Sequence, residues 1–378
     1  MICIVEPLCL GHEHAPVNAG LIKVVQNTFP KADIWFYGSD THVAAVRAIL
    51  TDSEPKLGFK TIEVPLRGTG FAKRLRQEVA LMSRLRGQPQ LDRLILASAD
   101  TSTVQALNVL HRAWRRPIPP TYVILHSVVA QIWGWWPRNP VRRIAHLAQA
   151  LKWSHANCRF VVLESYIRDA LIEKLPNIAP AIRVLPHPIT AEERARTSVK
   201  PVLAAPIHFG FLGAATANKG FDYFLDMAET VGRAYPGAVR FSAIGPICDM
   251  LDDPRLSWLH NKPTQRGLGR SEFLEAAQTL DYVVMPFRDH YRYAASGTLM
   301  DALTLSCPII SSDLPAFRYL ESLYGDIGYV RPMRELAEVV RTIAGHPDPE
   351  RYARQVDGIR AAARARLPDT LATLDTFA

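Results

Sequence analysis

The chain has 378 residues, of which 48% are hydrophobic and 21% are charged, and its formal net charge is +8. This length predicts two domains, because single domains usually hold about 100–200 residues, and the basic charge suits an anionic partner without choosing among them. The five cysteines are scattered without a CxxC pair and no run of 18 apolar residues occurs, which excludes a disulfide framework and a transmembrane helix.

The first half of the chain alternates short apolar runs with amphipathic segments. Strands are expected at 2–5, 34–37, 93–97, 122–125 and 160–163. Helical spacing of apolar residues falls between them, at 17–28, 71–85 and 102–112. Strands that alternate with helices predict a parallel sheet, with ligands at the carboxyl ends of its strands.

A stretch rich in charge, proline and alanine at 190–206 interrupts this pattern, which restarts with strands at 207–212, 239–244, 282–285 and 308–311. We therefore expect an α/β protein with two Rossmann-like parallel-sheet domains facing a cleft. The domains are placed at 1–190 and 207–350, joined by a linker at 191–206. The helical tail at 351–378 is expected to pack back on the N-terminal domain.

The first candidate site is the loop after the strand at 207–212, which contains Gly213 and Lys219. Its small residues let backbone N–H groups approach an anion, and the helix expected from about 221 adds a favourable dipole. Lys219 would add a point charge for a diphosphate. The structural alternative is a tight strand–helix turn with a solvated lysine.

The second candidate site is the segment 286–308, where a polar, aromatic loop leads from a strand into a helix. Ser296 is a good N-cap, and Gly297 and Thr298 expose backbone donors in the first turn. Asp301 follows about one turn later and could accept hydrogen bonds from ribose hydroxyls. The alternative is a capped helix with one solvated aspartate.

Histidines mark two further positions in the first half. His126 ends the strand expected at 122–125, at the edge where α/β sheets bind ligands, although a structural histidine fits the same pattern. Cys9, His12 and His14 lie close together, but no second ligand cluster at metal spacing accompanies them. No metal site is therefore predicted.

An aromatic and basic surface segment is expected at 132–143. It contains Trp133, Trp135, Trp136, Arg138, Arg142 and Arg143. Such a segment suits an anionic membrane interface, base stacking in single-stranded nucleic acid, or partial burial of the tryptophans near the ligand site. Because no nucleic-acid fold signature accompanies it, no nucleic-acid partner is predicted. We expect a cytoplasmic protein, at most peripheral on the inner face of the cell membrane.

In order and spacing, these segments resemble the large retaining glycosyltransferase family of GT-B fold that includes sucrose synthase and bacterial polysaccharide and lipopolysaccharide transferases. The resemblance covers nearly the whole chain, through segments 122–126, 160–165, 184–189, 209–220, 281–286 and 301–310. The last segment is the most specific, because its run from Asp301 to Ile310 is similar to the family pattern E-A-m-a-x-G-x-P-V-I.

The resemblance implies a set of donor-binding residues, which are Gly20, Gly213, Lys219, Gly245, Tyr293, Ser296, Gly297, Thr298 and Asp301. Within it, Lys219 would bind the diphosphate and Asp301 the ribose. Gly20 would correspond to the glycine loop after the first strand. Outside this set, His126 would lie near the transferred sugar.

Three positions depart from the family pattern. The family's two glutamates, separated by seven residues, are replaced by Tyr293 and Asp301, and the arginine partner of the lysine is replaced by Ala214. A tyrosine cannot supply a carboxylate for the sugar hydroxyls, so a neighbour in the same loop would have to compensate. The catalytic set is then His126, Lys219, Arg288 and Asp289.

The resemblance implies a metal-independent hexosyltransferase of bacterial polysaccharide synthesis. It would move a sugar from a nucleotide-diphosphate sugar to a glycan or polyprenyl-linked glycan acceptor, with retention, and would need no cofactor besides its donor substrate. The alternatives are an inverting transferase or an epimerase on the same fold, and a non-catalytic relative that binds nucleotide sugars.

Overall fold

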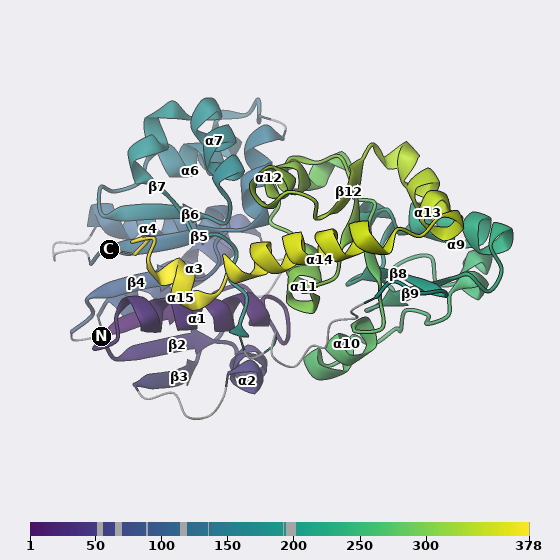
Figure 1. The fold of residues 1–378 in the computed structure, drawn as a ribbon. Helices are drawn as coiled ribbons and strands as arrows, with labels where there is room; N and C mark the ends of the chain where they lie inside the picture. The colour runs from purple at the N-terminus through teal and green to yellow at the C-terminus, as the bar shows by residue number, and fades with distance from the viewer. Residues whose placement is uncertain are drawn as a thin grey trace. The chain divides into compact units, whose positions relative to one another are not determined.

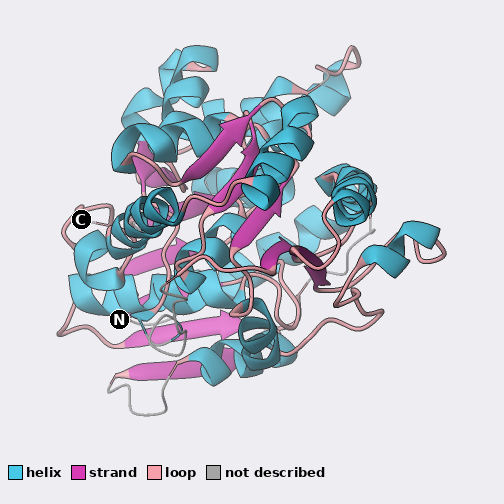
Figure 2. Cartoon of the chain, turned by 45° about the vertical axis from the view of Figure 1, so that its right-hand side comes forward, coloured by secondary structure: helices cyan, strands magenta, loops and turns pink. Residues whose placement is uncertain are grey.

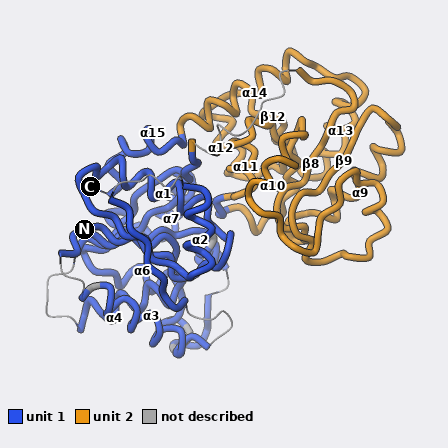
Figure 3. Tube along the Cα trace, turned by 90° about the horizontal axis from the view of Figure 1, so that it is seen from below, with its two compact units in different colours: residues 1–190, 293–295, 366–378 blue, residues 191–292, 296–365 orange. Residues whose placement is uncertain are grey.

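The computed structural model describes residues 1–50, 56–64, 70–87, 90–113, 119–134, 136–191, 193 and 202–377. They form two compact units, shown in Figure 3. Unit 1 comprises residues 1–190, 293–295 and 366–378, and unit 2 comprises residues 191–292 and 296–365.

Unit 1 is built on a seven-stranded sheet in the order β3-β2-β1-β4-β5-β6-β7 (Figure 1). Its strands are β1 Ile2–Val5, β2 Ile34–Gly38, β3 Leu57–Thr61, β4 Arg93–Leu96, β5 Thr121–Leu125, β6 Cys158–Val162 and β7 Ile182–Val184. All neighbouring strands pair in parallel; Ile4, for example, lies between Phe36 of β2 and Ile95 of β4.

Helices cover both faces of this sheet (Figure 2). They are α1 Ala15–Thr28, α2 Asp40–Ile49, α3 Phe71–Arg86, α4 Thr101–Ala113, α5 Pro140–Ile144, α6 Leu147–Lys152, α7 Ser165–Lys174 and α15 Pro368–Ala372. Successive strand residues point to opposite faces, so each strand feeds two cores. Ile4 packs in the core with α1, α2 and α15, whereas Val5 packs in the core with α3, α4, α6 and α7.

Unit 2 is built on a five-stranded parallel sheet in the order β12-β11-β10-β8-β9. Its strands are β8 Ile207–Leu212, β9 Val239–Ile244, β10 Tyr282–Met285, β11 Ile309–Ser312 and β12 Gly328–Arg331. Its helices are α9 Phe221–Ala234, α10 Arg270–Ala277, α11 Gly297–Leu305, α12 Pro315–Tyr324, α13 Leu336–Gly345 and α14 Pro349–Arg364. Phe209, Phe211 and Phe241 form the aromatic centre of one core, against α9, α13 and α14.

The expected architecture of two parallel-sheet α/β domains is confirmed. The sequence pattern did not reveal β3, β7 and β12. β3 is an edge strand that carries a glycine and exposed side chains, β7 has three residues, and β12 begins at Gly328. Each is too short or too mixed in polarity to show an apolar run.

The C-terminal tail divides between the two units. α14 belongs to unit 2, whereas residues 366–378 belong to unit 1, where α15 lies beside α1 (Figure 1). Arg366 fastens this end: it is buried and its guanidinium lies 2.8 Å from the Glu164 carboxylate, while its carbonyl accepts the N–H of Ile189. Among the described residues, no helix is long and apolar enough to cross a membrane.

Candidate functional site

In unit 2 the order of the strands reverses at β8. The chain passes from β8 to β9 on one side, and then crosses to β10 on the other side of β8. Open α/β sheets bind ligands at the carboxyl ends of the strands where the order reverses in this way. The loops that leave β8 and β10 at this edge, 213–220 and 286–296, hold four of the nine donor-site residues predicted from the sequence, and the first turns of α11 hold three more.

Gly213 follows β8 with a φ of +85°, a conformation that favours glycine. Its N–H donates to the carbonyl of Ile244 at 2.9 Å. A Cβ on Gly245 would lie 2.3 Å from the Gly213 carbonyl oxygen, so the predicted Gly245 is required for the close passage of two backbones. At the end of β8, glycine is therefore favoured at 213 by the backbone conformation and required at 245 by close packing.

Lys219 turns back toward Gly213. It ends a short 3-10 turn, Ala217–Lys219, in which the Thr216 side chain caps the Lys219 N–H. Its Nζ lies 3.3 Å from the position that a Cβ would take on Gly213. Burial lowers the pKa of Lys219, and the nearby Asp301 and Cys248 oppose this shift. A partly desolvated ammonium has much to gain from a bound anion.

The N-terminus of α11 also lies at the end of β8. Ser296 is the N-cap, as predicted, and its hydroxyl accepts the N–H of Leu299 at 3.2 Å. Thr298 donates its hydroxyl to the carbonyl of Leu212, the last residue of β8, at 3.2 Å. The Thr298 oxygen lies 3.5 Å from the would-be Cβ of Gly213. Within the described parts of the chain, the N–H groups of Gly297 and Thr298 have no hydrogen-bond acceptor.

We refer to Gly213, Lys219 and Thr298 as the Gly213 cradle. It combines a fixed ammonium, the positive end of a helix and a position without a side chain, which is an arrangement suited to a phosphate. The cradle is built by residues 85 positions apart, since Thr298 follows β10 and Gly213 follows β8. The direct juxtaposition supports the predicted roles of Lys219, Gly297 and Thr298, which stay predictions.

Asp301 lies one turn further along α11. Its Oδ1 accepts a hydrogen bond from Arg270 Nη1 at 2.6 Å. Burial raises the pKa of Asp301, while Arg270 and Lys219 oppose that shift. Asp301 is therefore close enough to the cradle to interact with Lys219, but its strongest contact is with a residue that no sequence motif indicated.

Arg288 and Asp289, the predicted substitutes for the missing carboxylate, make other contacts. Arg288 donates to the carbonyl of Ala217 at 3.0 Å and forms an ion pair with Asp222 at 2.6 Å. It thereby braces the loop that carries Lys219. Asp289 is 79% exposed and pairs with Arg292 at 2.8 Å. Catalytic roles for both residues stay predictions.

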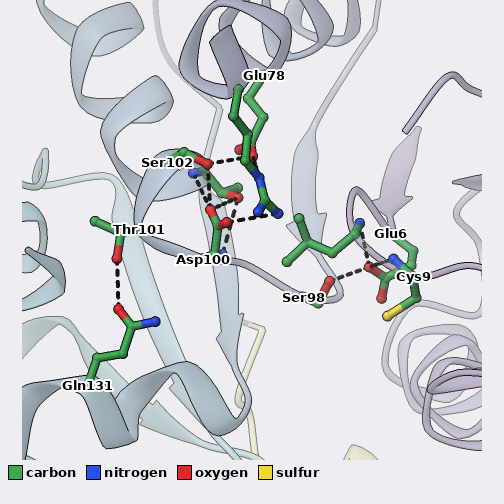
Figure 4. Close-up of polar contacts among 11 residues, drawn as sticks. Glu6, Cys9, Glu78, Ser98, Asp100, Thr101, Ser102 and Gln131 are labelled. Atoms are coloured by element: carbon green, nitrogen blue, oxygen red, sulfur yellow. Dashed lines mark hydrogen bonds and ion pairs between the residues drawn. The ribbon is translucent and has the colours of Figure 1, made fainter. Parts of the chain in front are cut away.

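Unit 1 has its own reversal of strand order, between β1 and β4. Glu6 follows β1 there and is fully buried (Figure 4). Its carboxylate accepts the N–H groups of Leu8 and Cys9, the Ser98 hydroxyl and the Asn18 amide. Burial raises the pKa of Glu6, but the hydrogen bonds from Ser98 and Asn18 outweigh it and the pKa is lowered. Glu6 is thus a buried anion that organises the loop after β1.

His126 lies at the end of β5, as predicted. Its Nε2 is 2.8 Å from the carbonyl of Ala97 and therefore carries a proton. Its ring stacks on His14, with centroids 4.4 Å apart. Burial, together with His14, lowers the pKa of His126 to about 3. The imidazole is neutral near pH 7, which leaves Nδ1 as an acceptor for a hydroxyl group.

The prediction that Gly20 lies in a glycine loop after the first strand is wrong. The loop after β1 spans residues 6–14, and Gly20 lies inside α1. A Cβ there would approach Pro188 Cβ to 2.9 Å. The close packing of the helix against the 185–189 segment is a sufficient reason for the glycine.

Tyr293, at the position of the family's first glutamate, belongs to unit 1. Its ring stacks on Trp133 with centroids 3.7 Å apart and an interplanar angle of 17°. Trp133 is thus half-buried, and a membrane role for it stays a prediction. Of the other residues in that predicted surface, Trp136 is 43% exposed and Arg138 and Arg143 are exposed, while Trp135 and the Arg142 side chain lie outside the described residues.

Sequence reasoning missed a carboxylate pair formed by Glu78 of α3 and Asp100, which follows β4 (Figure 4). Ser102 Oγ is 2.8 Å from Glu78 Oε1 and 2.7 Å from Asp100 Oδ1. Arg74 bridges the same two carboxylates at 3.3 and 2.8 Å. Burial and Asp100 raise the pKa of Glu78 to about 7. The run Asp100-Thr101-Ser102-Thr103 was an available N-cap signal, but nothing in sequence placed Glu78 beside it.

One group of potential metal ligands occurs among the described residues. Atoms of Glu6, Cys9 and His14 all lie within 4.8 Å of one another. The two oxygens of a carboxylate offer about four lone-pair sites, and Glu6 already accepts from four donors. Three of these donors bind Oε1 and only Asn18 binds Oε2, so the hydrogen bonding does not saturate the carboxylate, and the prediction of no metal stays a prediction.

No family model and no curated protein sequence matches the chain. Solved structures match it over nearly its full length. Sucrose-phosphate synthase from Thermosynechococcus elongatus has a TM-score of 0.68 at 12% identity, covering 98% of this chain and 96% of that one. Anabaena HepE in complex with UDP and glucose has a TM-score of 0.61 at 13% identity, covering 98% and 97%. A trehalose-6-phosphate structure from E. coli, bound with UDP-2-fluoro glucose, has a TM-score of 0.68 at 12% identity, covering 99% and 97%. At these identities the likeness establishes the fold, which is GT-B.

Proposed function

We propose that this protein is a glycosyltransferase that moves a hexose from a nucleoside-diphosphate sugar to a glycan or polyprenyl-linked glycan acceptor, with retention. The Gly213 cradle carries the proposal, because it places a buried ammonium and a helix N-terminus together at the sheet edge where nucleotides bind in α/β folds. Two structures of the same fold hold UDP with glucose and UDP-2-fluoro glucose, which supports this class of donor.

The chemistry follows from charge development at the donor. The bond between the anomeric carbon and the phosphate oxygen breaks, a new bond forms from that carbon to the acceptor oxygen, and the acceptor's proton passes to the departing diphosphate. Negative charge grows on the departing diphosphate. Lys219 and the N–H groups of Gly297 and Thr298 would stabilise it without reorganising. Because these groups supply positive charge by themselves, metal independence is part of the proposal.

Lys219→Ala tests the proposal most directly. If Lys219 contacts the leaving diphosphate, its loss should lower kcat by about 10²- to 10³-fold, or roughly 3–4 kcal/mol. Lys262→Ala removes an exposed lysine of the same unit and serves as the matched control. Donors are first found by thermal shift against a panel of nucleotide sugars, since a ligand of the folded state raises the melting temperature. Wild-type turnover by Lys219→Ala would remove the cradle from the mechanism.

Product stereochemistry separates the proposal from its enzymatic alternatives. NMR of the anomeric proton distinguishes retention from inversion, and an epimerase would change the donor sugar without an acceptor. Chelation with EDTA should leave turnover unchanged. A rate restored only by added Mg²⁺ would contradict metal independence.

A non-catalytic relative that binds nucleotide sugars is the second candidate function. The stacked ring of Tyr293, in place of a carboxylate that could hold the sugar hydroxyls, favours it. Donor binding without transfer or hydrolysis, across a broad acceptor panel, would support this reading. In either case the nucleotide would occupy the same cradle.

A further inference from the structure

Arg270 occupies an unfavourable place for a cation. It is the first residue of α10, whose N-cap is Gly269 and whose first turn holds Glu272. Helix N-termini carry partial positive charge and disfavour cations there. An arginine at this position therefore requires partners elsewhere that outweigh the helix dipole.

All three guanidinium nitrogens of Arg270 bind carboxylates. Nε and Nη2 contact the two oxygens of Glu193 at 2.6 and 3.3 Å, and Nη1 contacts Asp301 Oδ1 at 2.6 Å. Glu193 is 2% exposed, while the side chains of Arg270 and Asp301 are 19% and 17% exposed. The guanidinium also lies over the ring of Phe273, 5.5 Å from its centroid. Glu193, Arg270 and Asp301 thus form a largely buried ion-pair network in which the guanidinium lies between two carboxylates.

This arrangement leaves one oxygen of Asp301 for a ligand. Among the described residues Asp301 Oδ2 has no hydrogen-bond partner, whereas Oδ1 is held by Arg270. Aspartate is one methylene shorter than the glutamate that the family resemblance implies at this position. A carboxylate on a shorter side chain has less freedom to find a ligand, so its orientation must be set by its surroundings.

We propose that Arg270, clamped by Glu193, is a positioning residue that orients Asp301 so that Oδ2 accepts a ribose hydroxyl of the nucleotide. This inference rests on the proposed function, because it assumes that a nucleoside diphosphate occupies the Gly213 cradle. Glu193 comes from the segment that the sequence predicted to be a linker. The two hydrogen bonds from Nε and Nη2 of Arg270 to Glu193 would be enough to hold that segment against α10. The third nitrogen, Nη1, binds Asp301 instead, on the side where the nucleotide would lie.

Arg270 has a second effect, on ionisation. Burial and Glu193 both raise the pKa of Asp301, and Arg270 is the main opposing influence. Without Arg270, Asp301 would hold its proton to higher pH, and the protonated carboxyl is a weaker acceptor. The effect of losing Arg270 should therefore fade as the pH rises, which a purely structural role would not produce.

Ribose discrimination tests the inference. The affinities of UDP and 2′-deoxy-UDP are measured by calorimetry between pH 6 and 9, with GDP and ADP and their 2′-deoxy forms used if they bind more tightly. A hydrogen bond to a charged acceptor predicts that the wild type prefers the ribose form by roughly tenfold or more. Arg270→Met should bring this ratio close to one at pH 7 while changing the affinity for 2′-deoxy-UDP little.

Further variants separate positioning from folding. Arg270→Lys keeps the charge but loses the fork, so it should restore part of the discrimination, and Glu193→Gln should weaken it. Arg351→Met is the matched control, since Arg351 also pairs with a carboxylate, Asp326 at 3.1 Å, and lies over the ring of Tyr329. It should preserve full discrimination.

The outcomes distinguish the two levels of the argument. Failure of every nucleoside diphosphate to bind the wild type overturns the proposed function and with it this inference. Binding without ribose discrimination, or discrimination retained by Arg270→Met at every pH, overturns the inference and leaves the proposed function standing. If Arg270→Met does not fold, Arg270→Lys and Glu193→Gln decide the matter by the same ratio.

Discussion

Glu78→Gln should change how the stability of unit 1 depends on pH. Glu78 is fully buried on α3, and it faces Asp100 from the end of β4, Ser102 and Thr103 from α4, and Arg74 from its own helix. The Ser102 oxygen lies within hydrogen-bond distance of both carboxylates. A hydroxyl has a single proton, so both contacts are satisfied when Glu78 is protonated and donates to Ser102.

The magnitude follows from the pKa. Burial and Asp100 raise the pKa of Glu78 from 4.5 to about 7, and each pKa unit corresponds to about 1.4 kcal/mol. The folded state holds this proton more tightly than the unfolded chain does. Stability is therefore lost as the pH rises from about 4.5 to 7, by about 3 kcal/mol in total, and no further loss from Glu78 occurs above that range. Glutamine carries no proton to lose, so the variant should gain this amount relative to the wild type over the same interval.

Urea unfolding at pH 5 to 8.5, followed by tryptophan fluorescence, measures the effect. Six of the seven tryptophans lie between residues 35 and 153, so the signal reports mainly on unit 1. Asp100→Asn is the companion variant: removing its charge should lower the pKa of Glu78 and shrink the pH dependence. Parallel stability curves for the wild type and Glu78→Gln across this range would refute the reasoning.

Three further outcomes are expected. Arg366→Met should destabilise unit 1 by about 3–5 kcal/mol in chemical denaturation, because it leaves the buried Glu164 carboxylate unpaired; a double variant with Glu164→Gln should recover much of the loss, and a cost below about 1 kcal/mol would contradict this account. Since the pKa of His126 is lowered to about 3, His126 should not ionise between pH 5 and 9, and the pH profile of donor turnover in that range should have the same shape in the wild type and in His126→Gln. Flotation with anionic vesicles should recover the wild type and less of Trp136→Ala, with Trp258→Ala as a control of similar exposure in unit 2; equal recovery of both variants, or none of the wild type, would speak against a membrane role for Trp136.

Local features of the candidate site were readable from the sequence. The strands at Ile207–Leu212, Val239–Ile244 and Tyr282–Met285 match their expected bounds, because short, predominantly apolar runs followed by glycine or proline are typical of buried parallel strands. The N-cap at Ser296 was predicted for the same local reason, since a hydroxyl that accepts an N–H three residues on needs no tertiary partner.

Features that depend on packing were either misjudged or left open. Gly20 was assigned to a loop although apolar spacing had already placed a helix over it, and only the contact with Pro188 explains the glycine. For Trp133, a membrane surface and partial burial were both left open, because tryptophan beside arginine fits a membrane interface as well as it fits a stack on Tyr293. The aromatic partner lies 160 residues away in the chain, and no periodicity connects the two.

By itself, the sequence determined most of the strands, though not β3, β7 and β12, together with the loops that follow them and the side chains those loops carry, since these follow from short-range spacing and capping. The tertiary structure alone decided which loops lie together at one edge of a sheet. It brought Gly213 against Thr298, and Arg270 between Glu193 and Asp301, which are 77 and 31 residues from it in the chain. These contacts between distant residues depend on the order of the strands in the sheet. That order is set by how two hydrophobic cores are filled, a property of all the strands and helices together rather than of any one segment.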